Sequence, residues 1–375
     1  MPIQPLIIEK GIIQPSFGKS RRNSFFRVTV ISAGVLTKAG IPVGQSKTVI
    51  NERESVRPLR INPSETEIKY LDADAIYFCI PQNHFGHVLT GTMAFAHILP
   101  DGPYKNHKVV FTAFPPDYEA PCEAIKILLK HLGVKEEDII TVDEYTQFRS
   151  VVIVEPSLRC VRLSRFRKRL FAIDREFADT FRAISARFTD RKYPDKVYFS
   201  RGKISHRPIM FEDKIERIFE KNGYEIFYPE QLPLDEQIKL VANANYYACL
   251  QGTLEHHSLF MKDNATMITI SRKSGRTERQ VLINQLQKNI RHIYLRGNIQ
   301  PFGDKISPNI VGITGHFIPF FDEHHFVYSA DDWKLTDQEI NDYVEKCSWR
   351  DIPLPKNILR RILRYFLRKH QKSVE

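Results

Sequence analysis

The sequence predicts an α/β protein made of two domains, each with a mainly parallel sheet covered by helices, that face each other across a cleft. The chain has 375 residues, which is enough for two domains of ordinary size. Its residues are 42% hydrophobic and 11% aromatic, which excludes a disordered chain. From residue 196 onward, short apolar segments alternate with longer amphipathic segments. This alternation is typical of strands and helices that build a parallel sheet.

The second half of the chain shows the alternation most clearly. Strands are expected at residues 197–200, 224–229, 245–252, 265–271 and 291–295. Helices are expected at residues 211–223, 234–244 and 279–289, and a short helix is expected to start near Glu255. We therefore predict a Rossmann-like domain over residues 190–330.

The first half alternates less clearly but in the same sense. Strands are expected at residues 25–36, 76–80, 108–114, 139–144 and 151–156, and helices near 88–99 and at 123–133. Gly133 suits the left-handed C-cap of the second of these helices. A basic segment at 159–190 is expected to be helical and to contain or border the domain junction. The N-terminal domain is accordingly predicted to cover residues 1–165.

The charge balance is basic and indicates anionic partners. The chain has 55 Lys and Arg residues and 44 Asp and Glu residues, a net charge of +11. Such a protein attracts nucleic acid, anionic lipid or phosphorylated small molecules. The charge is concentrated at residues 159–169 and in the C-terminal tail, and the sequence shows no nucleic-acid-binding motif. Nucleic-acid binding is therefore the least favoured of these alternatives, and we predict no nucleic-acid partner.

Three sequence features favour a cytoplasmic location. The five cysteines are widely spaced and form no Cys-x-x-Cys pair, so we expect reduced thiols. No apolar run approaches the roughly 18 residues that a membrane span needs. The N-terminal residues lack the charged-then-apolar pattern of a signal peptide. We expect a cytoplasmic protein that can also lie peripherally on the inner face of the membrane.

The tail, at residues 331–375, is expected to be a C-terminal helical segment that ends in an amphipathic helix. On that helix, one side carries the apolar residues Ile358, Leu359, Ile362, Leu363 and Phe366, and the other largely carries Arg360, Arg361, Arg364 and Arg368. Two alternatives follow. Residues 357–372 can lie on an anionic membrane surface, or their apolar side can dock on the body of the protein.

Two strand ends carry residues that suit an anion. Ser200 and Arg201 end one expected strand, and Gly252 ends another. In open parallel sheets, ligands bind outside the carboxyl ends of the strands. The helix expected after Gly252 presents backbone N–H groups and its dipole, which favour a phosphate. Arg201 and Arg207 can add charge-assisted hydrogen bonds. The pattern predicts a phosphate site at this edge.

These residues lie in segments that resemble glycosyltransferase family 61. VYFSRGKISHRPIMFED and GYEIFYPEQLPLDEQIKLVANANYYACLQGTLEHHSLFM are similar to its C-terminal domain, and NHFGHVLTG is similar to its N-terminal Asn-aromatic-Gly-His stretch. The resemblance covers roughly residues 75–275. The matching positions are Asn83, Phe85, Gly86, His87, Ser200, Arg201, Arg207, Glu212, Gly223, Pro229, Glu230, Glu236, Gln237, Gly252, Thr253, His257, Leu259 and Phe260.

The resemblance implies a two-domain GT-B fold and an inverting enzyme that needs no metal and no cofactor. The donor is expected to be a nucleotide sugar, most simply a UDP-sugar. The acceptor is expected to be a growing surface glycan, such as capsular polysaccharide or lipopolysaccharide, or a lipid-linked glycan, bound on the side of the N-terminal domain. The expected donor-binding residues are Ser200, Arg201, Arg207, Glu212, Gly252, Thr253, His256 and His257.

Inverting transfer also needs a general base within hydrogen-bond reach of the acceptor hydroxyl. His87 and Glu255 are the candidate catalytic residues. His87 can instead be a buried histidine that orients a loop, and Glu255 can instead be an N-cap carboxylate. Similarly, His256 and His257 can face the nucleotide or pack in the interior, and Glu212 can contact the ribose or complement a helix dipole.

One departure from the family pattern leaves a further alternative open. Family members commonly carry an acidic residue four positions after the histidine, where this chain has Gly91. A non-catalytic glycan-binding or scaffold protein of the same fold is therefore an alternative to an enzyme. Asp72 and Asp74 form an Asp-x-Asp pair that can hold a divalent cation in the other main transferase fold. Here the pair precedes its apolar run instead of ending it, so we predict no metal site.

Overall fold

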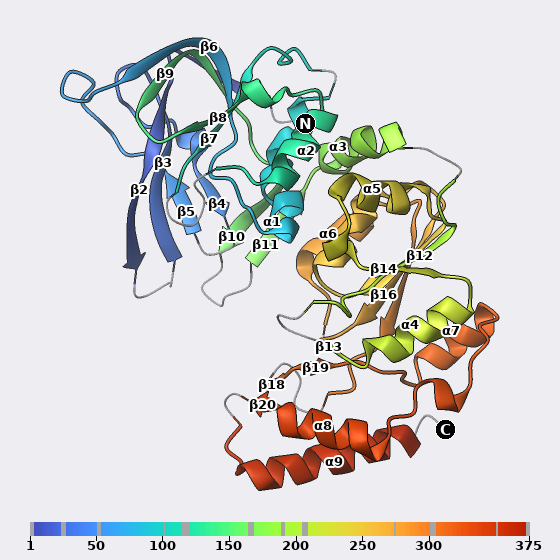
Figure 1. Cartoon of the computed structure of the whole chain (residues 1–375). Helices are drawn as coiled ribbons and strands as arrows, with labels where there is room; N and C mark the ends of the chain where they lie inside the picture. Colours follow the sequence, from blue (N-terminus) through green and yellow to red (C-terminus); the bar gives the residue numbers. More distant parts are fainter. Residues whose placement is uncertain are drawn as a thin grey trace. The chain divides into compact units, whose positions relative to one another are not determined.

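The computed structural model describes residues 4–23, 28–50, 54–100, 102–114, 120–163, 169–188, 192–204, 209–273, 275–300, 305–349 and 352–372. The chain divides into two compact units, residues 1–187 and 188–375, drawn from blue to green and from yellow-green to red in Figure 1. The tail after residue 330 is part of the second unit.

The first unit contains a mixed nine-stranded sheet. Its strands, in spatial order, are β4 (Thr48–Ile50), β5 (Glu54–Arg57), β3 (Val28–Leu36), β2 (Ile12–Asn23), β9 (Thr146–Ile153), β6 (Lys69–Tyr77), β7 (Lys108–Thr112) and β8 (Ile139–Val142), with β1 (Leu6–Glu9) also paired to β9. The run β9-β6-β7-β8 is parallel, as expected. The long strands β2 and β3 pair antiparallel, so this half of the sheet departs from the predicted alternation.

Helices of the first unit lie where the sequence predicts them. They are α1 (Phe85–Thr90), the 3₁₀ helix η2 (Thr92–Ile98), α2 (Glu123–His131) and α3 (Arg175–Ser185), with short 3₁₀ turns η1 (Gly44–Ser46), η3 (Glu136–Asp138) and η4 (Ala186–Phe188). Gly133 has φ +88° just after α2, which confirms the expected left-handed residue at this helix end.

The expectation of one helical segment over residues 159–190 is wrong in its first part. The strands β10 (Leu158–Leu163) and β11 (Arg169–Ile173) form an antiparallel hairpin, and only α3 and η4 are helical. Arg159 and Arg162 of β10 lie three residues apart, and the pairing with β11 shifts register between Cys160 and Arg162, so this strand lacks a regular two-residue period. The irregular register and the high density of arginine hid the strand in the sequence.

The second unit contains a fully parallel five-stranded sheet. Its spatial order is β14 (Glu225–Phe227), β12 (Lys196–Phe199), β15 (Tyr246–Leu250), β16 (Thr266–Ser271) and β17 (Arg291–Arg296). The connecting helices are α4 (Glu212–Lys221), α5 (Leu234–Asn243), η6 (Thr253–Phe260) and α6 (Glu278–Leu286), with the short turn η5 (Pro229–Gln231). The strands and helices predicted for this part of the chain are confirmed.

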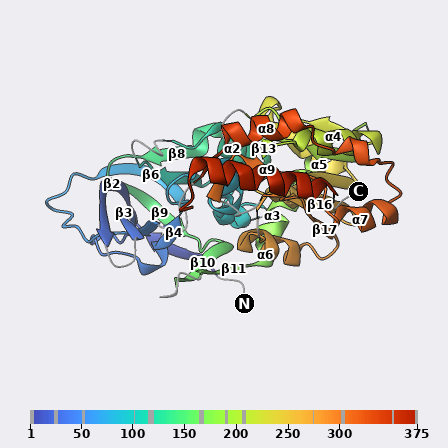
Figure 2. The same cartoon turned by 90° about the horizontal axis from the view of Figure 1, so that it is seen from below.

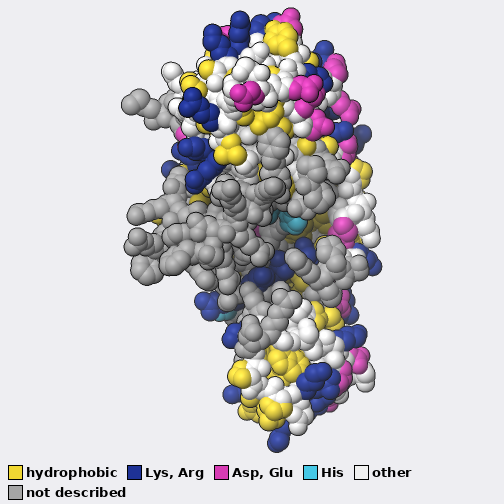
Figure 3. Space-filling view, turned by 90° about the vertical axis from the view of Figure 1, so that its left-hand side faces the viewer, with side chains coloured by type: hydrophobic (Ala, Val, Ile, Leu, Met, Phe, Trp, Pro, Cys, Tyr) yellow, Lys and Arg dark blue, Asp and Glu magenta, His cyan; other side chains and the backbone are white. Residues whose placement is uncertain are grey.

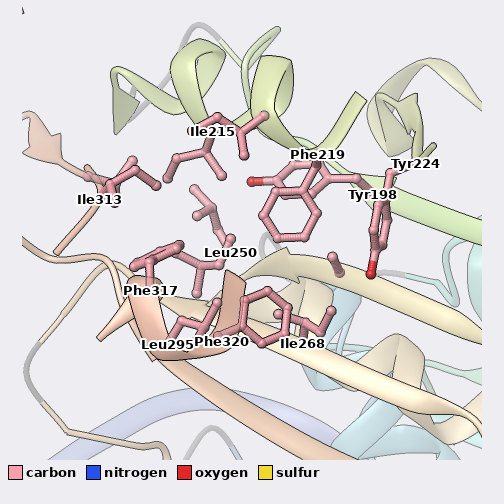
Figure 4. Close-up of a cluster of buried hydrophobic side chains, with 14 of the residues drawn as sticks. Tyr198, Ile215, Phe219, Tyr224, Leu250, Ile268, Leu295, Ile313, Phe317 and Phe320 are labelled. Atoms are coloured by element: carbon pink, nitrogen blue, oxygen red, sulfur yellow. The ribbon is translucent and has the colours of Figure 1, made fainter. Parts of the chain in front are cut away.

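Helices cover both faces of this sheet. On one face, α4 and α7 (Phe317–Glu323) pack against alternate strand residues in the cluster drawn in Figure 4. Phe219 of α4 and Phe317 of α7 are fully buried there beside Tyr198 and Leu250. On the other face, η6 packs on β15 and contacts α5 and α6. Figure 1 shows α4 and α7 on one side of the sheet and α5 and α6 on the other.

The tail forms a small helical layer with its own apolar cluster. Its elements are β13 (Ile209–Met210), β18 (Ile306–Ser307), β19 (Asn309–Ile310), η8 (Ala330–Asp332), α8 (Asp337–Lys346), β20 (Ser348–Trp349) and α9 (Lys356–Lys372). The helices α8 and α9 lie side by side in Figures 1 and 2. Leu359, Leu363 and Leu367 of α9 are fully buried in this cluster.

Ion pairs reinforce the contact between α9 and α8. Arg360 and Arg364 both pair with Glu345, at 2.7 and 2.9 Å, and Arg368 pairs with Asp337 at 2.8 Å. The inward side of α9 therefore docks on the protein body, which is the second of the two alternatives for this helix. Within the described residues, no helix is long and apolar enough to cross a membrane.

Candidate active site

The strand order of the second unit has its switch point between β12 and β15. The chain moves from β12 outward to β14 on one side, then returns to β15 on the other side. In doubly wound sheets, such a switch point is where ligands bind, outside the carboxyl ends of the strands. Phe199 pairs with Cys249 in the parallel register, so Arg201 and Gly252 follow adjacent strands at the same edge. Neighbouring strands lie about 4.8 Å apart.

The turn after β12 is built on the carboxyl groups of Glu216 and Glu212. The hydroxyl of the fully buried Ser200 donates to Glu216 and accepts a hydrogen bond from the amide of Gly202 at 2.8 Å. Oε1 of Glu212 accepts from the Arg201 amide at 3.1 Å and from the Tyr198 hydroxyl at 3.2 Å. These contacts hold the turn, so Ser200 and Glu212 act on the site by positioning the backbone of Arg201.

Glu212 lies in the first turn of α4 and is almost fully buried. Burial raises the pKa of Glu212 to about 8, because an ionised carboxylate loses its hydration there. The Arg201 amide opposes this shift by donating a hydrogen bond. Glu212 is therefore mostly protonated at neutral pH, and among the described residues its Oε2 has no hydrogen-bond partner.

Arg201 offers a guanidinium at the switch point. The side chain is half-buried, and its Nε is buried without a hydrogen-bond partner among the described residues. A buried N–H donor of a charged group without an acceptor is costly, and an anionic ligand supplies acceptors. Arg207, the second expected cation, lies outside the described residues.

The turn after β15 requires glycine for two reasons. Gly252 has φ +134° and ψ −142°, a conformation that residues with a side chain rarely adopt. A Cβ at this position would also lie 2.9 Å from Nη2 of Arg272. The turn is closed by a reciprocal pair of hydrogen bonds, from the Gly252 amide to Glu255 at 2.8 Å and from the Glu255 amide back to Gly252 at 3.0 Å.

Arg272 is a cation of the site that the sequence analysis missed. It follows the end of β16, and its Nε donates to the carbonyl of Gln251 at 2.6 Å, which places its guanidinium against the Gly252 turn. The sequence feature that could have revealed Arg272 is its position directly after an expected strand. Arg201 occupies the same position after β12. Arg201 and Arg272 thus both belong to the carboxyl edge, on strands that flank β15.

Glu255 is a capping residue at the N3 position of η6, three residues after the N-cap Gly252, whereas the alternative interpretation placed it at the N-cap itself. Its carboxylate holds the Gly252 amide and is almost fully buried. Burial raises the pKa of Glu255 to about 7, while the Gly252 amide, Arg272 and Arg276 oppose this shift. Since the carboxylate is committed to the turn, its contribution to the site is to hold the backbone amides of η6 in place.

The two neighbouring histidines have different surroundings. His257 is fully buried on the sheet, with its ring 5.2 Å from that of Phe199 and its Nε2 2.9 Å from Oε1 of Gln237. Burial lowers the pKa of His257 to about 3, so it is neutral. The structure therefore supports packing for His257. His256 is only half-buried, and its Nδ1 lies 2.8 Å from Oε1 of Gln280.

His87 lies on α1 of the first unit and is half-buried. Its ring centroid is 5.2 Å from that of His84. The nearby Gly91 faces the amide of the buried Gln82, and a Cβ at position 91 would lie 2.8 Å from Cδ of Gln82. An acidic side chain at position 91 would therefore have to displace the side-chain amide of Gln82.

The Asp-x-Asp pair is part of an ion pair on the sheet of the first unit. Asp74 binds Arg149 at 2.6 Å and Ser150 at 2.7 Å. These hydrogen bonds, led by that from Arg149, lower the pKa of Asp74 to about 2. In the described part of the chain, no group of three or more His, Cys, Asp and Glu residues could hold a metal ion.

A doubly wound parallel sheet with arginines and a glycine turn at its switch point is typical of proteins that bind nucleotides. The family model for glycosyltransferase 61 matches residues 85–268, which run from α1 to β16 and include both His87 and the Gly252 turn. Residues 85–268 therefore belong to glycosyltransferase family 61, which identifies the protein as a glycosyltransferase. A search of curated proteins finds no match.

Proposed function

We propose that this glycosyltransferase moves a sugar from a nucleotide-sugar donor, with UDP as the nucleotide, to a growing surface glycan. The acceptor is a capsular polysaccharide or lipopolysaccharide chain, and the anomeric carbon is inverted. The observation that carries the proposal is the juxtaposition of Arg201 and the Gly252 turn at adjacent strand ends, with Arg272 against the turn.

The donor diphosphate is proposed to bind across this edge. Arg201 and Arg272 supply two positive charges, and the first amides of η6 have no acceptor within their own helix. As the bond between the anomeric carbon and the diphosphate breaks, negative charge develops on the leaving oxygen. Fixed cations and amides stabilise that charge without reorganisation. They can take the place of a divalent cation, so we expect activity to persist in the presence of a chelator.

The general base is proposed to be His87. In a GT-B arrangement, the first unit supplies the acceptor side, and the acceptor hydroxyl gives its proton to the imidazole as its oxygen bonds to the anomeric carbon. Glu255 is not proposed for this step, because its carboxylate closes the Gly252 turn. Because position 91 is glycine, His87 has no acidic side chain four residues after it.

The outward face of α9 is proposed to contact an anionic membrane on its cytoplasmic side. Ile358 and Tyr365 are exposed on this face, and Arg361 and Lys369 are exposed beside them. Figure 3 shows hydrophobic side chains beside Lys and Arg side chains at its lower end, over the α8–α9 region. Apolar and cationic side chains together suit the interface of an anionic leaflet, where lipid-linked acceptors lie.

A thermal-shift screen with UDP-, GDP-, CMP- and dTDP-sugars tests the donor. A ligand that binds only the folded protein raises its melting temperature by mass action. We expect the largest rise with a UDP-sugar, and no rise with any nucleotide sugar would contradict the proposal. Turnover of the donor with and without EDTA then separates an enzyme from a non-catalytic glycan-binding protein. Loss of turnover in EDTA that manganese restores would overturn metal independence.

A further inference from the structure

The second unit has an open pocket of about 500 Å³ at the end of β17. Its lining includes Arg296, Asn298, Gln300, His316, Phe366 and His370. The last two residues come from α9, so the C-terminal helix supplies one wall. Neither β17 nor α9 contributes to the proposed diphosphate site.

The pocket lies at the same sheet edge as the Gly252 turn but apart from it. Arg296 is the last residue of β17 and pairs with Ser271, the last residue of β16. The Gly297 amide donates to the Ser271 hydroxyl at 3.2 Å, which fixes the start of the loop after β17. Two strand spacings, about 10 Å, separate β17 from β15.

The basic side chains of the pocket have no acidic partner in the described part of the chain. Arg296 and His316 are both exposed, and none of the described acids pairs with either side chain. The guanidinium presents several N–H donors, and the imidazole adds another donor or acceptor. A carboxylate or phosphate is the ligand group that such donors bind in charge-assisted hydrogen bonds.

The remaining lining suits a sugar ring. Phe366 is 39% exposed and offers an aromatic surface to the apolar C–H groups of a sugar. Gln300 is only 8% exposed, and its Nε2 donates to the carbonyl of Ile306 at 2.6 Å. Its buried Oε1 has no partner among the described residues and can accept from a hydroxyl. The side-chain Oδ1 of Asn298 already accepts a hydrogen bond from the backbone N–H of Gln300 at 2.8 Å, which holds the Asn298 side chain beside Gln300.

We propose that this pocket binds an acidic sugar, that is, a sugar ring that carries a carboxylate or a phosphate. Arg296 and His316 bind the anionic group, Phe366 packs on the ring, and the amide side chains bind hydroxyls. The acidic sugar belongs to the glycan acceptor, an assignment that rests on the proposed function. Binding itself does not depend on that function.

Ligand-observed NMR tests the pocket with glucuronic acid, glucose 6-phosphate and uncharged glucose as probes. We expect millimolar binding of either or both acidic sugars, at least about tenfold tighter than glucose because the anion adds charge-assisted bonds. Preference for glucuronic acid assigns the ligand to carboxylate sugars, and preference for glucose 6-phosphate assigns it to phosphorylated ones. Equal binding of glucose, or no acidic sugar binding up to about 20 mM, overturns the proposal.

Two variants with matched controls locate the binding. Arg296→Gln and Phe366→Ala are each expected to lower the affinity of the pocket for the acidic sugar by about tenfold. Arg361→Gln and Tyr365→Ala are the controls, since both are exposed on α9 and neither lines the pocket. An equal loss in the controls contradicts the proposal. If Phe366→Ala lowers the melting temperature, Arg296→Gln still tests the pocket, because Arg296 is exposed and its replacement should not disturb the fold.

Competition with UDP separates the two proposals. We expect UDP to leave acidic-sugar binding unchanged, because the diphosphate site uses other strand ends. Displacement by UDP would make the pocket part of the donor site and overturn the inference. Acidic-sugar binding without any nucleotide binding would instead overturn the proposed donor and leave the pocket in place.

Discussion

Arg272 and Gly252 fit each other closely: the guanidinium of Arg272 occupies the space that any side chain at position 252 would need, with Nη2 2.9 Å from the missing Cβ. The arginine follows β16 and the glycine follows β15, so the fit joins the ends of two neighbouring strands. It keeps a cation directly beside the amides that begin η6.

Gly252→Ala is expected to destabilise the second unit and to abolish nucleotide binding. The alanine must adopt φ +134° and displace Arg272, at a cost of about 1–3 kcal/mol. Thermal unfolding and the shift caused by a UDP-sugar measure the two effects. Gly44→Ala is the control, because nothing lies within 4 Å of a Cβ there. A normal nucleotide shift in Gly252→Ala would show that the turn is not part of the donor site.

Arg201→Ala is expected to lower kcat by about a hundredfold or more while the fold stays intact, because one of the cations on the leaving diphosphate is lost. Donor turnover and circular dichroism measure activity and folding. Arg217→Ala is the control. It removes an exposed arginine of α4 that pairs with Asp213, so it makes the same change in charge at a position away from the strand ends of the candidate site. Near-normal turnover in Arg201→Ala would refute the assigned role.

The free energy of unfolding of Glu212→Gln is expected to rise relative to that of the wild type as the pH rises. The folded protein keeps the Glu212 proton up to a pKa of about 8, whereas the unfolded chain releases it near the ordinary pKa of 4.5. Wild-type stability therefore falls as the pH rises through this window, by at most about 1.4 kcal/mol per pH unit for one proton. The glutamine does not titrate, so the variant lacks this fall.

Urea unfolding at several pH values across this window measures the difference for Glu212→Gln. Glu220→Gln, an exposed residue of the same helix, is the control and should follow the wild type. Glu255 still titrates in both proteins with a pKa of about 7, so some fall below that pH should remain. A pH-independent difference between Glu212→Gln and wild type would contradict the prediction.

Leu363→Ala is expected to lower the free energy of unfolding by about 2–5 kcal/mol, since it leaves a cavity between α9 and α8. Ile358→Ala, at an exposed position of the same helix, should cost about 0.5 kcal/mol or less. Deletion of residues 357–375 should lower thermal stability for the same reason. Equal effects of Leu363→Ala and Ile358→Ala would mean that α9 does not dock through its leucines.

Replacement of Ile358 and Tyr365 by serine is expected to reduce binding to phosphatidylglycerol vesicles and to leave the melting temperature unchanged. Both side chains lie on the outward face, and Tyr365 is 67% exposed. Vesicle sedimentation at low and high salt measures binding, which should weaken with salt because part of it is electrostatic. Equal binding of the wild type to neutral phosphatidylcholine vesicles would count against the electrostatic contribution.

The second unit was predictable from the sequence because each of its strands and helices carries its own local period. The first unit was less so, since β2 and β3 pair across irregular registers that no local pattern reports. Similarly, the hairpin of β10 and β11 was hidden by its arginines. Beyond β17, Phe317, Phe320 and Phe321 repeat at helical spacing on α7 and are buried in the core.

The sequence predicted only those residues of the candidate site that directly follow a predicted strand. Arg201 and Gly252 end their strands, so the register alone places them together. Arg272 contacts the Gly252 turn because β15 pairs with β16, and the sequence predicted both strands but neither their pairing nor the side-chain contact. The roles of Glu255 and His257 depend on burial, since burial decides whether a polar side chain faces a ligand or holds a turn.

The contact between Gly91 and Gln82 has a consequence for how this enzyme can change over time. An aspartate or glutamate at position 91 would have to push the side-chain amide of Gln82 out of the adjoining space. The effect of an acidic residue at position 91 therefore depends on which residue stands at position 82.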